Sequence, residues 1–275
     1  MKLTINDRAI LNNGISMPYF GLGTYKITSH KEATTAVAAA LEKGYRLIDT
    51  ARMYNNEKYI GAAVRASGIP REDIFITTKL WTNEHGKNNT LRAFNDSLKQ
   101  LNTDYVDLFL IHWPDGGKRI ETWKAMEELL AQEKCKAIGV SNFAVKHINE
   151  FLDNCSVVPA VNQVEFSPFL HQKDLLAYCV TKGIQLEAYS PLGRGNKVKD
   201  PLIDIVAKKY SKSPAQILIR WALQHKIIVI PKSADKQRII ENADVFDFEI
   251  TEEDMNYLNM LNTNYRLAAD PEEIE

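Results

Sequence analysis

The chain has 275 residues, of which 45% are hydrophobic and 25% are charged, and its formal net charge is −1. This composition is typical of a globular protein with a sizeable core, and the small net charge excludes a global attraction to nucleic acid or anionic membranes. Three widely spaced cysteines form neither a disulfide framework nor a zinc motif, which favours a reducing cytosol. No apolar run approaches the roughly 20 residues of a membrane span, and the N-terminal stretch lacks the apolar core of a signal peptide.

The first elements predicted along the chain are a β-hairpin and then a regular series of strands. In the hairpin, LTIN (3–6) alternates, NNG (12–14) turns and ISM (15–17) follows. Short apolar runs then predict eight strands at 19–25, 45–50, 74–80, 106–112, 137–142, 160–166, 184–190 and 227–232. Most of these runs are almost continuously apolar, as expected for a parallel sheet that is buried on both faces.

Helical patterns fill the intervals between these strands. Ser29 and Glu32 have capping-box spacing before an alanine-rich apolar stripe, and Gly44 suits the end of that helix. Ser213 and Pro214 are typical of a helix start, and Thr251 precedes three acidic residues that suit the first turn of a last helix. Further helices are predicted at 57–67, 90–101, 120–133, 145–153, 172–182, 200–209 and 235–243.

Eight strands alternating with helices predict a single α/β domain over 1–275, a (β/α)8 TIM barrel with an N-terminal hairpin and extra C-terminal helices. The alternative is an open, doubly wound dinucleotide-binding sheet. That fold normally carries G-x-G-x-x-G in an early turn, whereas GLGTYK (21–26) lacks the third glycine and GRG (193–195) fits no better. The barrel is therefore the predicted fold.

Polar side chains gather at the predicted strand ends, where a barrel of this kind has its active site. Asp49 and Lys79 end neighbouring strands at similar depth, so each can neutralise the other in an otherwise apolar setting. Tyr54 follows the strand of Asp49, and His112 ends the strand that comes after that of Lys79. The other polar residues at strand ends are Ser141, Asn142, Gln163, Glu165, Tyr189, Ser190, Lys232 and Ser233.

This set of groups suits proton delivery to a carbonyl oxygen. A tyrosine has an ordinary pKa of about 10. Tyr54 can act as a proton donor and acceptor near neutrality if a cation stabilises its phenolate, and Lys79 could supply that charge and lower the pKa by about 2 units. Asp49 would keep Lys79 charged, and His112 could orient the carbonyl by a hydrogen bond. Reduction of that carbonyl would also need a hydride source. A Schiff-base lyase using Lys79 is a rival hypothesis, but Asp49 disfavours the neutral amine that such chemistry requires.

Longer motifs show a resemblance to the aldo-keto reductase family. GYRLIDTARMYNNE (44–57) resembles the family signature G-x-R-x-x-D-T-A-x-x-Y-x-N-E, and it is followed in the family's order by TTKLW, LFLIHWP, IGVSNF, VNQVEFSP, AYSPLG and IPKS with RIIEN. The match covers nearly the whole chain and is most similar to the bacterial and protozoal short-loop branch, which includes diketo-gluconate and methylglyoxal reductases and prostaglandin F synthases.

The resemblance implies a catalytic tetrad of Asp49, Tyr54, Lys79 and His112, with Tyr54 as general acid, and NADPH as the cofactor. It implies roles for further residues in cofactor binding: Ser141, Asn142 and Gln163 at the carboxamide, Tyr189 at the nicotinamide, Ser190 and Leu192 at the pyrophosphate, Thr24 nearby, Lys232, Ser233 and Arg238 at the 2′-phosphate, and Glu241 and Asn242 at the adenine.

The substrate is less well defined than the cofactor. Many relatives carry Trp at the pocket position of Tyr25, and a phenol there makes the pocket more polar. Trp81 and Trp113 follow tetrad members and are expected as aromatic walls beside His112. The segments expected to choose the substrate are 113–119, 193–200 and the tail from 262.

The predicted activity is NADPH-dependent reduction of small aldehydes and ketones by a cytoplasmic protein, and the resemblance implies a monomer. No metal site, nucleic-acid partner or membrane partner is predicted. The alternative is a cofactor-sensing regulatory subunit of the same fold without physiological turnover.

Overall fold

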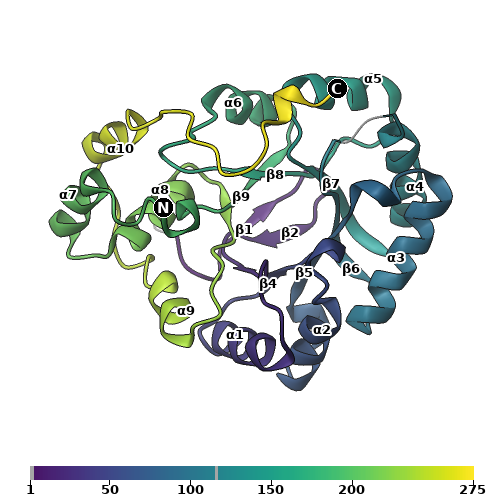
Figure 1. Ribbon diagram of the computed structural model, residues 1–275, viewed down its shortest axis with the longest axis horizontal. Helices are drawn as coiled ribbons and strands as arrows, with labels where there is room; N and C mark the ends of the chain where they lie inside the picture. The colour runs from purple at the N-terminus through teal and green to yellow at the C-terminus, as the bar shows by residue number, and fades with distance from the viewer. Residues whose placement is uncertain (1–2, 115–116) are drawn as a thin grey trace.

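The computed structural model describes residues 3–114 and 117–275. An eight-stranded parallel sheet lies at the centre of the molecule with helices around it (Figure 1). Each strand pairs with the next one along the chain, as the predicted alternation of strands and helices requires. The strands are β3 (Leu22–Gly23), β4 (Leu47–Asp49), β5 (Phe75–Leu80), β6 (Val106–Ile111), β7 (Cys135–Ser141), β8 (Val161–Glu165), β9 (Gln185–Tyr189) and β10 (Ile228–Val229).

The first and last strands of the sheet also meet each other. Parallel bridges join Phe20 to Val229 and Gly23 to Lys232, and the Gly21 amide donates to the Val229 carbonyl at 2.9 Å. This arrangement is consistent with the predicted (β/α)8 barrel. β3 and β10 are each only two residues long, shorter than the predicted 19–25 and 227–232. Pro231 contributes to this because it has no N–H to donate to a continued ladder.

The helices follow the predicted pattern closely. They are α1 (His30–Glu42), α2 (Glu57–Ala66), α3 (Lys87–Leu101), α4 (Arg119–Ala131), α5 (Val145–Asn154), α6 (Lys173–Thr181), α7 (Pro201–Tyr210), α8 (Pro214–Gln224), α9 (Lys236–Ala243) and α10 (Glu252–Asn259). Of the two helices added to the βα repeat, α10 follows α9 and α7 lies between β9 and α8.

The three side chains predicted to cap helix starts do so, but only one of the two predicted bonds of the Ser29–Glu32 capping box forms. The Ser213 hydroxyl caps α8 within a complete capping box, and the Thr251 hydroxyl accepts from the Asp254 amide at the start of α10. Ser29 likewise accepts from the Glu32 amide. In a complete capping box, the Glu32 carboxylate would also accept from the backbone N–H of Ser29. Here it accepts instead from the backbone N–H of the preceding residue, Thr28, at 2.9 Å.

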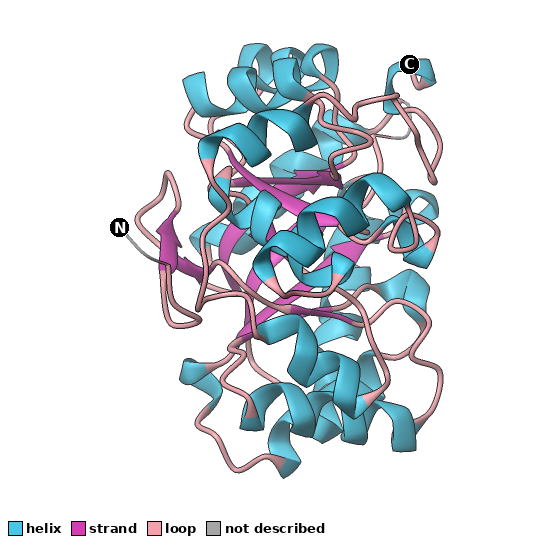
Figure 2. Ribbon diagram, turned by 90° about the vertical axis from the view of Figure 1, so that its left-hand side faces the viewer, coloured by secondary structure: helices cyan, strands magenta, loops and turns pink. Residues whose placement is uncertain are grey.

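The N-terminal hairpin is confirmed, but its predicted first strand is wrong. β1 (Arg8–Ile10) pairs antiparallel with β2 (Ser16–Pro18), whereas LTIN at 3–6 enters a turn closed by the bond from the Asp7 amide to the Thr4 carbonyl. The Asp7 carboxylate also accepts from the Thr4 hydroxyl at 2.9 Å, which favours the turn over an extended strand. The hairpin projects beside one end of the sheet (Figure 2).

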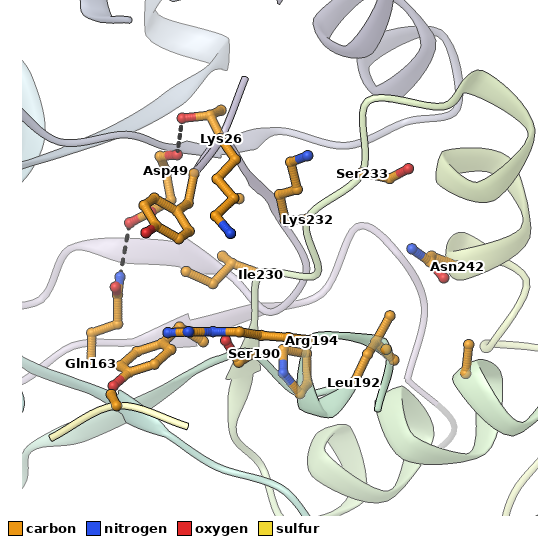
Figure 3. Close-up of a pocket in the computed structure, with 18 of the residues that line it drawn as sticks. Lys26, Asp49, Gln163, Ser190, Leu192, Arg194, Ile230, Lys232, Ser233 and Asn242 are labelled. Carbon is orange, nitrogen blue, oxygen red and sulfur yellow. Dashed lines mark hydrogen bonds between the residues drawn. The ribbon is translucent and has the colours of Figure 1, made fainter. Parts of the chain in front are cut away.

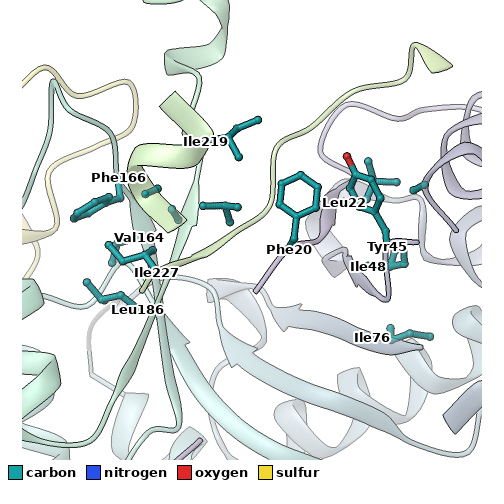
Figure 4. Packing of buried hydrophobic residues seen from close by; sticks show 14 of the residues in the cluster. Phe20, Leu22, Tyr45, Ile48, Ile76, Val164, Phe166, Leu186, Ile219 and Ile227 are labelled. Carbon is teal, nitrogen blue, oxygen red and sulfur yellow. The ribbon is translucent and has the colours of Figure 1, made fainter. Parts of the chain in front are cut away.

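Two layers of apolar side chains hold the sheet in place. The larger layer packs between the strands and the helices and includes Phe20, Tyr45 and Ile48, with the Phe20 and Tyr45 rings 4.7 Å apart (Figure 4). The smaller layer includes Leu47 and hairpin residues such as Met17. Alternation along β4 therefore sends Leu47 and Asp49 to one face and Ile48 to the other. The hairpin covers the amino ends of the strands and leaves the carboxyl ends for a site.

Candidate active site

A cavity of about 680 Å³ lies at the carboxyl ends of the strands (Figure 3). It extends from Asp49 on one side, past Lys232, to Ser233 and Asn242 on the other (Figure 3). The predicted site residues that line it are Thr24, Tyr25, Asp49, Tyr54, His112, Trp113, Asn142, Gln163, Tyr189, Ser190, Leu192, Lys232, Ser233, Arg238, Glu241 and Asn242.

Asp49 and Lys79 form a buried ion pair at the floor of this cavity. The Lys79 Nζ lies 2.6 and 2.7 Å from the two Asp49 carboxylate oxygens and also donates to the Thr50 carbonyl at 3.0 Å. Burial is the largest single effect on the pKa of Lys79 and lowers it, but the charge and hydrogen bonds of Asp49 together with the acidic groups of Tyr54 and Glu187 outweigh burial, so the Lys79 pKa is raised. Lys79 is thus held as an ammonium, which disfavours the Schiff-base hypothesis.

Tyr54 reaches this ion pair from the short helix η1 (Arg52–Tyr54) that follows β4. Its hydroxyl lies 3.4 Å from the Lys79 Nζ. The loop behind it is fixed by Asn56, whose buried amide donates to the Thr24 and Ile27 carbonyls at 2.9 and 3.0 Å. The phenol is therefore placed by local backbone contacts that do not depend on a substrate.

The pKa of Tyr54 differs from the sequence-based expectation. Burial raises it to about 12, although the charge of Lys79 opposes that rise. The predicted net lowering is therefore wrong, because desolvation of the phenolate outweighs the attraction of the ammonium. Tyr54 keeps its proton at neutral pH, which is the form that a general acid needs.

His112 directly follows β6 and joins this cluster. Its ring lies edge-on to Tyr54 with 5.7 Å between ring centroids, and its carbonyl accepts from the Asn142 amide at 3.0 Å. Burial lowers the His112 pKa well below its usual value, and the Lys79 charge adds to this effect. A neutral imidazole results, which can donate one N–H to a substrate oxygen.

The other walls of the cavity hold polar groups in fixed orientations. The Tyr189 hydroxyl donates to the Asn142 side-chain oxygen at 2.8 Å, and the Asn142 amide donates to the Ser141 hydroxyl at 3.1 Å. Asn142 and Ser190 have φ of 61° and 50°. Backbone of this kind is uncommon outside glycine and recurs at ligand sites.

The far end of the cavity is cationic. Lys232 and Arg238 line it beside Ser233 and the start of α9. Burial lowers the Lys232 pKa, the positive charges of Arg238 and Lys26 lower it further, and Glu32 opposes them. Mutual repulsion of these cations favours an anionic ligand between them.

Three predicted site residues do not line the cavity. Lys79 lies beneath its floor, and Ser141 contributes through Asn142. Trp81, predicted as a substrate wall, packs instead against the His112 ring with 5.1 Å between centroids. Of the segment 113–119, residues 115 and 116 lie outside the described part of the chain.

Several lining residues were not predicted individually, although five of them lie in the predicted substrate segments 193–200 and from 262 onward. They are Gly23, Lys26, Met53, Pro191, Arg194, Gly195, Val198, Lys199, Ser213, Ala215, Ile230 and Ala268. Another residue that was not predicted, Glu187, carries a carboxyl group inside the apolar run IQLEAYS and lies buried near Asp49. Charged residues inside strands were a criterion for Asp49 and Lys79, and the same criterion selects Glu187.

The described residues include no group of three or more His, Cys, Asp or Glu side chains that could hold a metal ion. Over the same residues, no helix has both the length and the apolar character needed to cross a membrane.

Comparison with known proteins agrees with this geometry. The model of the Aldo/keto reductase family matches residues 19–263. The chain belongs to the aldo/keto reductase family. It is 48% identical to a glyoxal reductase of Bacillus subtilis (strain 168), over 100% of this chain and 99% of that protein. It is 45% identical to a 9,11-endoperoxide prostaglandin H2 reductase of Trypanosoma cruzi (strain CL Brener), over 95% and 94% of the two chains.

Solved structures of aldo/keto reductases have the same fold. The crystal structure of MGS-M4, an aldo-keto reductase from a Medee basin deep-sea metagenome library, is 45% identical with a TM-score of 0.93, over 97% of this chain and 99% of that one. As an aldo/keto reductase with relatives named as reductases, the protein is an oxidoreductase acting on carbonyl groups. Aldo/keto reductases generally use nicotinamide cofactors.

Proposed function

We propose that the protein reduces small aldehydes and ketones to alcohols with NADPH, and that Tyr54 is the general acid. The observation that carries this proposal is the contact of the Tyr54 hydroxyl with Lys79, 3.4 Å away, at the floor of the cavity. The glyoxal reductase relative makes small dicarbonyl compounds the first substrates to test.

The residues present fit a phosphorylated dinucleotide. At the cationic end, Lys232, Ser233 and Arg238 would hold the 2′-phosphate, with Glu241 and Asn242 at the adenine. Ser190 and Leu192 would contact the pyrophosphate, with Thr24 nearby. At the catalytic end, Ser141, Asn142 and Gln163 would hold the carboxamide, and Tyr189 would lie against the nicotinamide. When bound, NADPH supplies the hydride that adds to the carbonyl carbon.

The chain's own groups handle the oxygen of the substrate. The neutral His112 donates a hydrogen bond that orients the carbonyl oxygen, and Tyr54 gives that oxygen its proton as negative charge develops there. The phenolate left on Tyr54 is stabilised by the Lys79 ammonium, which Asp49 keeps charged, until a proton from solvent restores it. Tyr25 and Trp113 would contact the rest of the substrate, and Trp81 would support the position of His112.

Replacement of Tyr54 by Phe tests this assignment. Turnover of glyoxal or methylglyoxal, followed by loss of reduced-nicotinamide absorbance, should fall by at least about 100-fold, while the NADPH dissociation constant measured by fluorescence stays the same. Tyr59→Phe is the matched control, since Tyr59 lies on α2 outside the cavity. Near-normal turnover by the Tyr54→Phe variant would contradict the proposal.

We also propose that the protein is a cytoplasmic monomer. Cys135 and Cys179 are free and buried in the structure, which is compatible with a reducing compartment. Light scattering during gel filtration tests the oligomeric state, and a mass of two chains would contradict a monomer. Cell fractionation tests the location.

A further inference from the structure

A second buried carboxyl group lies next to the catalytic ion pair. Glu187 is on β9 and has no exposed surface. β9 pairs with β8 so that Glu187 lies opposite Gln163, and with β10 so that it lies opposite Ile228. The charged groups that act on it are Asp49 from β4 and Lys79 from β5.

Gln163 connects the two carboxyl groups. Its side-chain nitrogen donates to Asp49 Oδ2 and to Glu187 Oε2, each at 2.8 Å. A primary amide has two N–H groups, so both are used by these contacts. Gln163 lines the cavity, and with both N–H groups used, its side chain can act toward a ligand only as an acceptor through its oxygen.

The charges of Asp49 and Lys79 in this buried cluster indicate that Glu187 is protonated. Two carboxylates and one ammonium would leave a net negative charge on buried side chains, which is strongly unfavourable. Asp49 receives two bonds from Lys79 and one from Gln163, so it is the carboxyl group best able to hold a charge. Glu187 receives only the bond from Gln163, and within the described residues its other oxygen has no hydrogen-bond partner.

We propose that Glu187 is a positioning residue that, as a neutral acid, fixes the Gln163 amide with its oxygen toward the cofactor, and that ionisation of Glu187 weakens catalysis at alkaline pH. The proposal rests on the proposed function, in which Gln163 accepts from the N–H of the cofactor carboxamide. Burial and, to a smaller extent, repulsion by Asp49 raise the pKa of Glu187 to about 8. Ionisation would place a second negative charge beside Lys79, which would weaken the stabilisation that Lys79 gives the Tyr54 phenolate.

The pH profile of kcat at saturating cofactor and substrate tests this role. Wild-type kcat should fall by about three- to tenfold as pH rises through about 8. Tyr54 cannot cause this fall because its pKa is raised to about 12.

Glu187→Gln keeps an acceptor oxygen for Gln163 but has no group that titrates. The variant should therefore keep kcat near wild type at neutral pH, and its kcat should not fall at alkaline pH. Glu187→Ala removes the acceptor, and it should weaken NADPH binding by about tenfold.

A matched control and an activity-independent measurement complete the test. Glu57→Gln removes another buried carboxyl group, one that accepts from Thr78 outside the cavity, and it should leave the pH profile unchanged. The infrared difference spectrum between wild type and Glu187→Gln should show a protonated carboxyl group at neutral pH that converts to a carboxylate near pH 8. This readout needs neither cofactor nor turnover, so it separates failure of this inference from failure of the proposed function.

Two results would overturn the inference. One is an infrared spectrum in which Glu187 is already a carboxylate at neutral pH. The other is a Glu187→Gln variant that keeps the full alkaline fall of the wild type.

Discussion

The Lys79 ammonium lies 3.4 Å from the Tyr54 hydroxyl and 2.6 Å from the nearer oxygen of Asp49. In the proposed mechanism, the cation therefore lies between the Asp49 carboxylate and the Tyr54 hydroxyl, which becomes negative when it gives up its proton. Because all three groups share one buried site, removal of any of them alters both the chemistry and the stability of the fold.

Lys79→Met is expected to abolish most turnover and to destabilise the protein. Loss of the ammonium leaves the Tyr54 phenolate without a counter-charge, which should lower kcat by about 100- to 1,000-fold. Asp49 is left buried and unpaired, which should cost about 3–5 kcal/mol in the free energy of unfolding. Urea unfolding and steady-state kinetics measure the two effects. The double variant Asp49→Asn with Lys79→Met should regain stability but not activity, and recovery of both would contradict the role given to Lys79.

Arg238→Ala is expected to weaken the binding of NADPH much more than the binding of NADH. Arg238 lines the cationic end of the cavity, and loss of its proposed contact with the 2′-phosphate should weaken NADPH binding by about tenfold and NADH binding by about twofold or less. Fluorescence titration measures both dissociation constants. Lys236→Ala is the control, since Lys236 is on the same helix but pairs with Glu42 at 3.3 Å outside the cavity. Equal losses for both cofactors in Arg238→Ala would contradict the assignment.

Glu165→Ala is expected to loosen the C-terminal segment over the cavity. The buried Glu165 carboxylate accepts from the Leu267 and Ala268 amides, each at 3.0 Å, and Ala268 lines the cavity. Loss of these bonds should destabilise the segment by about 1–3 kcal/mol and raise the KM of the carbonyl substrate, with little change in NADPH affinity. Limited proteolysis after residue 262 should be faster than in wild type. Cleavage at the wild-type rate would show that Glu165 does not hold this segment.

Glu187→Gln is expected to change how stability depends on pH. The pKa of Glu187 rises from 4.5 to about 8 on folding, so between these values the folded state keeps a proton that the unfolded state has lost. The contribution of this group is fully present below pH 4.5 and is lost as pH rises to about 8. Urea unfolding should therefore show the variant gaining stability relative to wild type over this interval. A constant difference between the two proteins would contradict a neutral Glu187.

The sequence by itself determined the alternation of strands and helices and the four residues of the proposed tetrad. These features are local: an apolar run of strand length, a capping residue, or a polar residue at a strand end can be recognised within a few positions. The signature from Gly44 to Glu57 also has fixed spacing, because η1 follows β4 directly. The first strand of the hairpin was misplaced because alternation in LTIN competed with the turn formed by Thr4 and Asp7.

Only the tertiary structure decided which distant groups share the floor of the cavity and what charge they carry. Gln163 and Asp49 are 114 residues apart in sequence, and their contact depends on the curvature that brings β8 across to β4. Burial then sets the pKa of Tyr54 and Glu187, and its extent depends on the packing of every surrounding strand. Desolvation and contact across the sheet are properties of the assembled chain, so no local pattern of residues encodes them.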